Sequence, residues 1–352
     1  MDDAALVQAV GLTKIYPARD GQPEFRAVDG IDFELRRGEA FGFLGPNGAG
    51  KSTTMRMIAA TSPRSGGTLR VLGMDPDTHG SAIRARLGVV PQDDALDREL
   101  TVRENLYIYG RYFGLRRAAI RARSAELLDF AQLEEKADSP VESLSGGMRR
   151  RLTIARSLMN NPDMVLLDEP TTGLDPQARH VLWDRLYRLK QDGVTLLLTT
   201  HYMDEAEQLC DRLMVVDHGR IVAQGSPREL IEAHVTREVL ELRFPLEIAE
   251  AAGAKLRASA LADPHSPESG AGFGPADSGC AGAGSPDPGA GPGSGSGPRV
   301  ELLPDRVLVY ADDGEAALAA VTAMGLVPLT ALVRRATLED VFLKLTGRSL
   351  VD

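Results

Sequence analysis

The sequence predicts an α/β fold with a mainly parallel sheet, and two features of the chain support this prediction. Short apolar runs alternate with longer helical patterns between residue 6 and about residue 235, which is typical of parallel strands covered by helices. Most of these runs are apolar throughout, as expected of strands buried on both faces. The strands are predicted at 41–44, 87–90, 164–167, 194–200 and 213–216.

A glycine-rich loop follows the first of these strands and opens a helix predicted over residues 51–60. Its residues are Gly45, Pro46, Asn47, Gly48, Ala49, Gly50, Lys51, Ser52 and Thr53. Such a loop turns successive backbone N–H groups and a helix N-terminus toward a triphosphate, with the lysine reaching the β- and γ-phosphates and the serine reaching Mg²⁺. A glycine-rich turn without a ligand is the alternative. The strand before the loop and the helix after it favour ATP binding.

Two carboxylates end the strand predicted at 164–167. Asp168 and Glu169 follow this buried run, and ligands of open α/β sheets collect at the carboxyl ends of strands. Asp168 is therefore expected to hold Mg²⁺ or its water, and Glu169 to orient and polarise the water that attacks the γ-phosphate. An ordinary acidic turn is the alternative for the pair taken alone.

The composition limits the other classes of protein. The formal net charge of -10 and the pI near 5.2 argue against a general nucleic-acid binder. Cys210 and Cys280 stand far apart without neighbouring ligands, so neither a disulfide scaffold nor a zinc site is predicted. The N-terminus lacks a secretory pattern, and the apolar runs are far shorter than the roughly 18 residues of a spanning helix. Any membrane role is expected to come through a partner.

The C-terminal third is predicted to form a small α/β domain with an insertion. Residues 263–298 contain 11 Gly and 7 Pro among 36 residues, a composition typical of disorder. Around this stretch we expect strands at 239–244, 306–310 and 327–333, and a helix over 313–324. A last helix is expected from Leu338, with Thr337 as N-cap and Asp340 at the third position.

A second glycine-containing helix start makes a family resemblance specific. Leu144, Ser145, Gly146 and Gly147 precede a basic amphipathic run, and one nucleotide does not need two such loops. This segment resembles the signature motif of ATP-binding-cassette (ABC) ATPases, which contacts the γ-phosphate bound to a partner subunit. A simple Ser N-cap without a ligand is the alternative. Met148 and Arg149 depart from the commonest signature, but they follow the Ser-Gly-Gly element.

Further motifs of that family occur in order. Tyr16 resembles the aromatic residue that stacks on adenine, Gln92 the Q-loop glutamine that also approaches the metal, Asp175 the D-loop aspartate, and His201 the switch histidine. Each taken alone has a plainer interpretation: a packing residue, a loop amide, a helix cap and a strand-end histidine. The resemblance implies a P-loop NTPase core with an N-terminal antiparallel β portion and a helical subdomain.

The resemblance also implies a domain division and a set of partners. We expect an ATP-binding domain over 6–237, with the helical subdomain at about 93–158, and an accessory domain over 238–346 interrupted at about 259–298. The aromatic and leucine residues after residue 101 are interpreted as core rather than as ligand contacts. The implied enzyme is a homodimer that sandwiches two ATP molecules and drives a separate polytopic permease from the cytoplasmic face of the membrane.

Several segments resemble ATPase subunits of the drug-resistance and nodulation-factor exporter group. These segments are 87–94, 100–106, 109–114 and 335–342. The resemblance implies export of a drug, natural product or lipid-like compound. A soluble cassette ATPase acting on ribosomes or nucleic acid is the main alternative, disfavoured by the single cassette and the acidic charge. An importer ATPase is a further alternative that the exporter-like tail disfavours.

Overall fold

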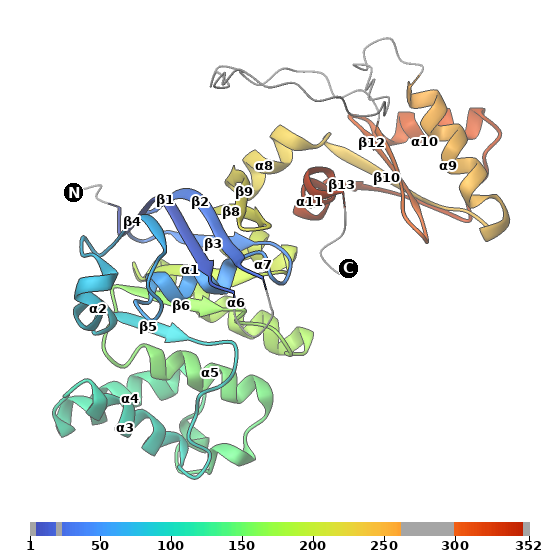
Figure 1. Cartoon of the computed structure of the whole chain (residues 1–352). Coiled ribbons are helices and arrows are strands. Elements are labelled where there is room, and N and C mark those ends of the chain that lie inside the picture. The colour runs from blue at the N-terminus through green and yellow to red at the C-terminus, as the bar shows by residue number, and fades with distance from the viewer. Residues whose placement is uncertain (1–4, 19–22, 262–298, 348–352) are drawn as a thin grey trace, which may run out of the picture. The chain divides into compact units, whose positions relative to one another are not determined.

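The computed structural model describes residues 5–18, 23–261 and 299–347, which divide into two compact units (Figure 1). Unit 1 comprises Met1–Leu230 with Leu345–Asp352, and unit 2 comprises Ile231–Lys344. The predicted Gly/Pro-rich insertion falls almost entirely outside the described residues. Helix α9 continues to Leu261, slightly past the start expected at about residue 259.

A six-stranded sheet forms the centre of unit 1, in the order β5-β6-β7-β3-β8-β9. Its first five strands are parallel, and β9 pairs antiparallel with β8 at one edge. The five strands predicted from the sequence are confirmed, and the sixth forms a hairpin with β8. The bounds are β3 Ala40–Leu44, β5 Leu87–Val90, β6 Met164–Asp168, β7 Thr195–Thr200, β8 Arg212–Asp217 and β9 Arg220–Gly225.

An antiparallel three-stranded sheet is formed by the N-terminal part of the chain, as expected. Its order is β2-β1-β4, with β1 Val7–Tyr16, β2 Phe25–Leu35 and β4 Gly66–Val71. Helix α1, Lys51–Ile58, shares a buried apolar core with both sheets. It ends two residues before the predicted end, because Ala60 adopts a left-handed backbone with φ of 53°.

The remaining helices of unit 1 include a helical subdomain. Helix α3 begins with a capping box, in which Thr101 accepts from the Glu104 N–H and the Glu104 carboxylate accepts from the Thr101 N–H. Helices α3, α4 and α5 pack against one another, and Leu106, Leu127 and Leu128 are buried among them, so the core interpretation is confirmed for these leucines. The bounds are α2 Pro76–Arg84, α3 Val102–Tyr112, α4 Arg117–Ala131, α5 Gly146–Ser157, α6 Pro176–Gln191 and α7 Met203–Leu209.

Unit 2 contains a four-stranded antiparallel sheet with the order β11-β12-β10-β13. The chain order β-α-β-β-α-β with this strand order is that of a ferredoxin-like fold. Helix α8 Pro227–His234 precedes it, and the other bounds are β10 Glu238–Arg243, α9 Leu246–Leu261, β11 Arg299–Leu302, β12 Val307–Ala311, α10 Gly314–Ala323, β13 Thr330–Arg335 and α11 Leu338–Thr346.

The expected elements of this unit are present, one of them shifted, while strand β11 and helix α9 were not among them. The strand predicted at 327–333 begins only at Thr330, because Gly325 has a left-handed backbone and Pro328 cannot donate to a ladder. Helix α9 was not predicted. Its alanines and lysine give a weak apolar pattern, and its formation depends on packing against β11.

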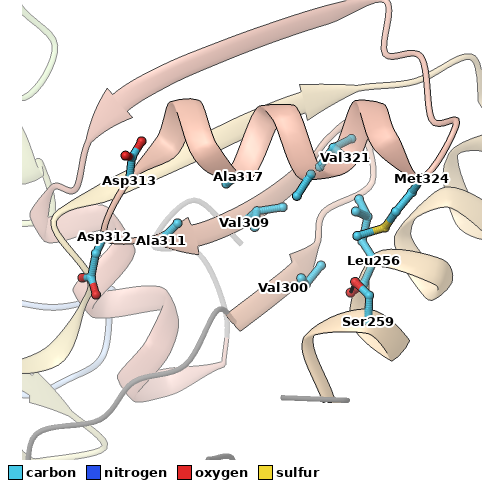
Figure 2. A pocket seen from close by; sticks show the side chains of 11 residues that line it. Leu256, Ser259, Val300, Val309, Ala311, Asp312, Asp313, Ala317, Val321 and Met324 are labelled. Carbon is cyan, nitrogen blue, oxygen red and sulfur yellow. Dashed lines mark hydrogen bonds between the residues drawn. The ribbon is translucent and has the colours of Figure 1, made fainter. Parts of the chain in front are cut away.

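A cavity of about 330 Å³ lies in unit 2 between α9, α10 and the sheet (Figure 2). Leu256, Val300, Val309 and Val321 line it from α9, β11, β12 and α10, while Asp312 lies at its end. Most of this lining is apolar, which does not suit a triphosphate. The phosphate chemistry is therefore expected in unit 1.

The start of α11 depends on a buried carboxylate. Asp340 is 1% exposed and accepts from both terminal nitrogens of Arg334, at 2.7 and 2.9 Å. It also accepts from the Thr337 backbone N–H at 2.8 Å, so the carboxylate at the third helical position caps the helix as predicted. This carboxylate joins β13 to α11.

We expect Asp340→Ala to lower the free energy of unfolding of unit 2 by about 3 kcal/mol. The variant removes both hydrogen bonds to the Arg334 guanidinium and leaves it the longer ion pair with Glu241, at 3.8 Å. Hydrogen exchange at the α11 amides measures this loss. Asp305→Ala is the control, since Asp305 is exposed and pairs only at the surface, where the expected change is below about 1 kcal/mol. Equal protection of the α11 amides from exchange in both variants would contradict the role of Asp340 in holding α11.

Candidate functional site

The phosphate-binding loop, residues 45–53, joins β3 to α1 and needs its glycines. Gly48 and Gly50 have φ values of +81° and +100°, which other L-residues rarely adopt. A Cβ at Gly50 would also lie 2.2 Å from the Ala27 carbonyl oxygen. The loop conformation therefore excludes side chains where the backbone N–H groups turn inward.

Lys51 begins α1 and is 5% exposed. Its Nζ donates to the carbonyl oxygens of Gly45 at 2.6 Å and Pro46 at 3.0 Å, which leaves one of its three donors for a ligand. Burial lowers the pKa of Lys51, while the charges of Glu169 and Asp168 oppose that shift. A buried ammonium held mainly by carbonyls fits an anion such as a phosphate.

A cavity of about 320 Å³ lies against this loop. Gln92, Glu169 and Phe25 line it together with residues 47–53. Among the described residues of this lining the aromatic one is Phe25, which is 55% exposed and pairs across the strands with Tyr16. Tyr16 lies outside the lining. The sequence offered no signal for Phe25, because only strand register brings it beside the loop.

The residues expected to hold a metal meet at the ends of β6 and α1. Ser52 Oγ donates to Asp168 Oδ1 at 3.1 Å, and Thr199 Oγ1 donates to the same oxygen at 2.5 Å. Among the described residues no group of three or more His, Cys, Asp or Glu side chains gathers for a metal. A hydroxyl and one carboxylate suit Mg²⁺, which takes few protein ligands and completes its shell with phosphates and water.

Glu169 stands at the centre of the candidate site. It is 7% exposed and has a left-handed backbone with φ of 45°, and its N–H donates to the Thr199 carbonyl at 3.1 Å. Its carboxylate accepts from Gln92 Nε2 at 3.2 Å and from Thr172 Oγ1 at 3.1 Å. A non-glycine residue in this conformation is strained, which is typical of functional turns.

His201 reaches the same carboxylate from the end of β7. Its Nδ1 lies 3.3 Å from Glu169 Oε1, without a hydrogen bond of good geometry. The Tyr202 ring packs against the imidazole with ring centroids 4.1 Å apart. The structure thus brings Lys51, Asp168, Glu169, Gln92 and His201 to one place, from strands that lie side by side.

The signature loop, Ser145–Gly147, and Asp175 form a second, separate cavity. This cavity measures about 460 Å³, and among the described residues its lining and that of the first cavity have no member in common. Ser145 caps α5 by accepting from the Met148 N–H at 3.3 Å, and Asp175 caps α6 by accepting from the Ala178 N–H at 2.9 Å. Two helix N-termini therefore face one cavity, an arrangement that favours an anion.

Sequence reasoning missed three polar residues around Glu169: Thr172, Thr199 and Arg150. Thr172 and Thr199 stand beside the predicted motifs, so their position in the chain was a usable signal. Arg150 is one of three consecutive arginines, and the run itself does not distinguish the buried one. No helix among the described residues has both the length and the apolar content that crossing a bilayer requires.

Comparison with known families finds two matches along the chain. The family model for ABC transporters matches residues 28–172. The model for the C-terminal domain of the nodulation factor export protein NodI matches residues 290–347. The first region includes the phosphate-binding loop, Gln92, Asp168 and Glu169, and the second includes the second half of unit 2.

Similar proteins match over nearly the whole chain. A Nod factor export ATP-binding protein I from Ralstonia nicotianae is 46% identical over 351 residues, covering 99% of this chain and 95% of that protein. The protein of the same name from Sinorhizobium fredii is 42% identical over 327 residues, covering 92% of this chain and 83% of its own length.

Solved structures match the nucleotide-binding part. CbiO1 from Clostridium perfringens, part of the ABC transporter complex cbiONQ, has a TM-score of 0.59 and 29% identity, covering 65% of this chain and 91% of its own. A dimeric, post-hydrolysis state of the ATP-binding cassette MJ0796, bound to ADP and Pi, has a TM-score of 0.57 and 27% identity, covering 62% and 98%.

We expect Lys51→Ala to weaken ATP binding roughly 10- to 100-fold, because the variant loses a charge-assisted hydrogen bond to phosphate. Calorimetric titration with ATP measures the dissociation constant. Lys190→Ala is the control, since Lys190 pairs with Asp211 at the surface, and its affinity should equal that of the wild type. An unchanged dissociation constant for Lys51→Ala would remove the lysine from the phosphate site.

Glu169→Gln is expected to retain ATP binding while its turnover falls by about 10²- to 10⁴-fold, since the amide cannot polarise the attacking water. Steady-state phosphate release and a parallel titration separate the two effects. Glu126→Gln removes an exposed carboxylate of α4 and serves as the control. Turnover at the wild-type rate in Glu169→Gln would refute the role.

Proposed function

The chain belongs to the ABC transporter family of ATP-binding proteins, and on this premise we propose how its residues divide the work and what it exports. It is an ATPase, the ATP-binding subunit of an ABC exporter. The observation that supports the residue roles best is the convergence of Gln92, Thr172 and His201 on the Glu169 carboxylate. This carboxylate faces the cavity of the phosphate-binding loop.

Hydrolysis, as we propose it, proceeds around a water placed between Glu169 and the γ-phosphate. Glu169 accepts the developing proton of this water, while Gln92 and Thr172 fix the orientation of the carboxylate. Lys51 and the N–H groups of residues 45–53 balance the charge that grows on the transferred phosphoryl group. His201 Nδ1 lies 3.3 Å from the same carboxylate, and its proposed role is to contact the γ-phosphate.

The metal proposed for the site is Mg²⁺. Ser52 Oγ, Asp168 and Gln92 would hold it, with Thr199 fixing the Asp168 carboxylate through its hydrogen bond of 2.5 Å. When bound, Mg²⁺ would neutralise part of the negative charge of the phosphates. Tyr16, at the end of β1, is proposed to stack on the adenine, with Phe25 as the neighbouring aromatic residue of the cavity.

Two chains are proposed to share each ATP. The phosphate-binding loop and the signature loop line separate cavities in one chain, so a single ATP in one chain cannot bridge both. A homodimer would bring both loops to the same ATP. In it, the ATP of one chain lies against Ser145, Gly146, Gly147 and Asp175 of its partner. The similar cassette MJ0796 is dimeric, which supports the proposal.

A separate polytopic permease is proposed as the second partner. The chain would bind it from the cytoplasmic face of the membrane, as a peripheral subunit. The helical subdomain after Gln92 is the proposed contact. Its Tyr109 and Phe113 rings pack edge to face with their centroids 5.4 Å apart, and Tyr112, next to Phe113 in the chain, is 80% exposed. CbiO1 is part of a transporter complex, which supports a multisubunit assembly.

The proposed cargo is a Nod factor or a related natural product. Relatives that match 92–99% of this chain are named for Nod factor export, and the match includes unit 2. This cargo falls within the natural-product and lipid-like classes that the sequence resemblance implies. No specific observation favours the alternative of a soluble ATPase acting on ribosomes or nucleic acid.

We expect tagged Glu169→Gln chain, isolated with ATP from native membranes, to carry a polytopic membrane protein in stoichiometric amount. Mass spectrometry identifies the co-purified proteins. The double variant Lys51→Ala/Glu169→Gln is the matched control, because it should not form the ATP-closed dimer. Recovery of ribosomal proteins in place of a membrane subunit would overturn the transport assignment.

A further inference from the structure

Arg150 is the most connected buried side chain near the candidate site. It lies on the first turns of α5, is 6% exposed, and donates five hydrogen bonds to backbone carbonyls. The acceptors are Pro170 at 2.7 Å from Nε, Pro91 at 2.5 Å and Gln92 at 3.1 Å from Nη1, and Asp168 at 2.9 Å and Glu169 at 3.1 Å from Nη2. These five bonds use every N–H that a guanidinium has.

No other side-chain type can supply these bonds. Lysine has three donors and glutamine two, and neither has the planar fork of a guanidinium. Burial lowers the pKa of Arg150, while the charges of Glu205, Asp168, Asp94 and Asp93 oppose the shift. The desolvated cation is thus balanced by nearby carboxylates and by carbonyl dipoles, and removing it would take a hydrogen-bond donor away from five carbonyls.

The five acceptors belong to two functional segments. Pro91 and Gln92 leave β5, and residues 168–170 form the turn that leaves β6. Glu169 sits in this turn with a left-handed backbone, and Arg150 bonds its carbonyl together with those before and after it. Arg150 therefore fixes both the strained turn that aims the Glu169 carboxylate and the start of the segment that carries Gln92.

Neighbouring arginines of α5 hold the continuation of that segment. Arg149 Nε lies 3.1 Å from Asp94 Oδ2, and Arg156 Nη1 donates to the Ala95 carbonyl at 2.5 Å. Helix α5 and the chain from Gln92 to Ala95 are thus joined along about two turns of helix. A displacement of the α5 N-terminus would move both Gln92 and the Glu169 turn.

We propose that Arg150 is a positioning residue that couples the signature loop of a chain to that chain's own Gln92 and Glu169. The inference rests on the proposed two-chain ATP sandwich, in which the signature loop binds the partner's ATP. Binding of the partner's ATP to the signature loop then fixes the position of α5 in this chain. Through its hydrogen bonds, Arg150 passes this change in position on to the Glu169 carboxylate at the chain's own ATP site. Cooperativity in ATP hydrolysis follows from this coupling.

The test compares Arg150→Met and Arg150→Lys with wild type in the full-length chain. We expect Arg150→Met to lower kcat about tenfold or more and to bring the Hill coefficient for ATP to about 1. The ATP dissociation constant should stay within about threefold of wild type, because Arg150 touches no residue of the phosphate-binding loop. Arg150→Lys, which keeps the charge and three donors, should recover part of both kcat and cooperativity.

Arg64→Met is the matched control for a general loss of stability. Arg64 makes three hydrogen bonds, to the Gly67 carbonyl and to both oxygens of Asp75, away from the candidate site. We expect this variant to unfold more easily and to keep the wild-type kcat and Hill coefficient. Fluorescence of Trp183, the single tryptophan of the chain, verifies that each variant is folded at the assay temperature.

Three results would overturn the inference, and they are distinguishable. ATP-dependent dimers of Glu169→Gln, seen by light scattering, together with an unchanged kcat and Hill coefficient in Arg150→Met would reject the role of Arg150 and leave the sandwich standing. Absence of such dimers would reject the sandwich and the coupling with it. A loss of kcat in Arg64→Met equal to that in Arg150→Met would also reject the coupling.

Discussion

Burial of the parallel strands on both faces is the constraint on which the candidate site depends. Strands β5, β6, β7 and β3 are neighbours in the sheet, and all of them run in the same direction. Their carboxyl ends therefore meet at one edge, where β3 leads into the phosphate-binding loop, β5 into Gln92, β6 into Asp168 and Glu169, and β7 into His201. Each strand contributes one component of the chemistry because hydrogen-bonded register leaves it no other place to end.

Buried charge is the second feature that unites the site. Lys51, Glu169 and Arg150 are all less than a tenth exposed, and carbonyl groups hold both cations. Such an arrangement is costly unless opposite charge lies nearby, since desolvation penalises isolated ions. Nearby carboxylates offset part of this cost. A polyphosphate beside Lys51 would offset more of it, so ligand binding relieves a penalty that is already present in the folded chain.

The separation of the two cavities explains why a single chain is an incomplete enzyme in our proposal. The signature loop and the phosphate-binding loop lie in one unit but line different cavities. The hydrogen bonds of Arg150 join helix α5, which follows the signature loop, to Gln92 and to the turn that carries Glu169. The partner's ATP at the signature loop and the chain's own ATP at the phosphate-binding loop would then both act on the segments that Arg150 joins. Unit 2 has its own core and its own antiparallel sheet, which is consistent with a role apart from hydrolysis.

The sequence by itself determined the strands of the parallel sheet, the phosphate-binding loop and the helix caps at Ser145 and Asp175. These features are encoded locally, in apolar runs, in glycines that adopt left-handed conformations and in polar residues at helix starts. Tertiary structure alone decided that Phe25 lines the loop cavity, that α9 forms, and that Arg150 rather than its neighbours is buried with five carbonyl partners. These outcomes depend on contacts between segments far apart in the chain, such as those of Arg150 with Pro91, 59 residues before it, and with Pro170, 20 residues after it. The spacing of residues along a chain does not predict such contacts, because they form only when separate elements pack together.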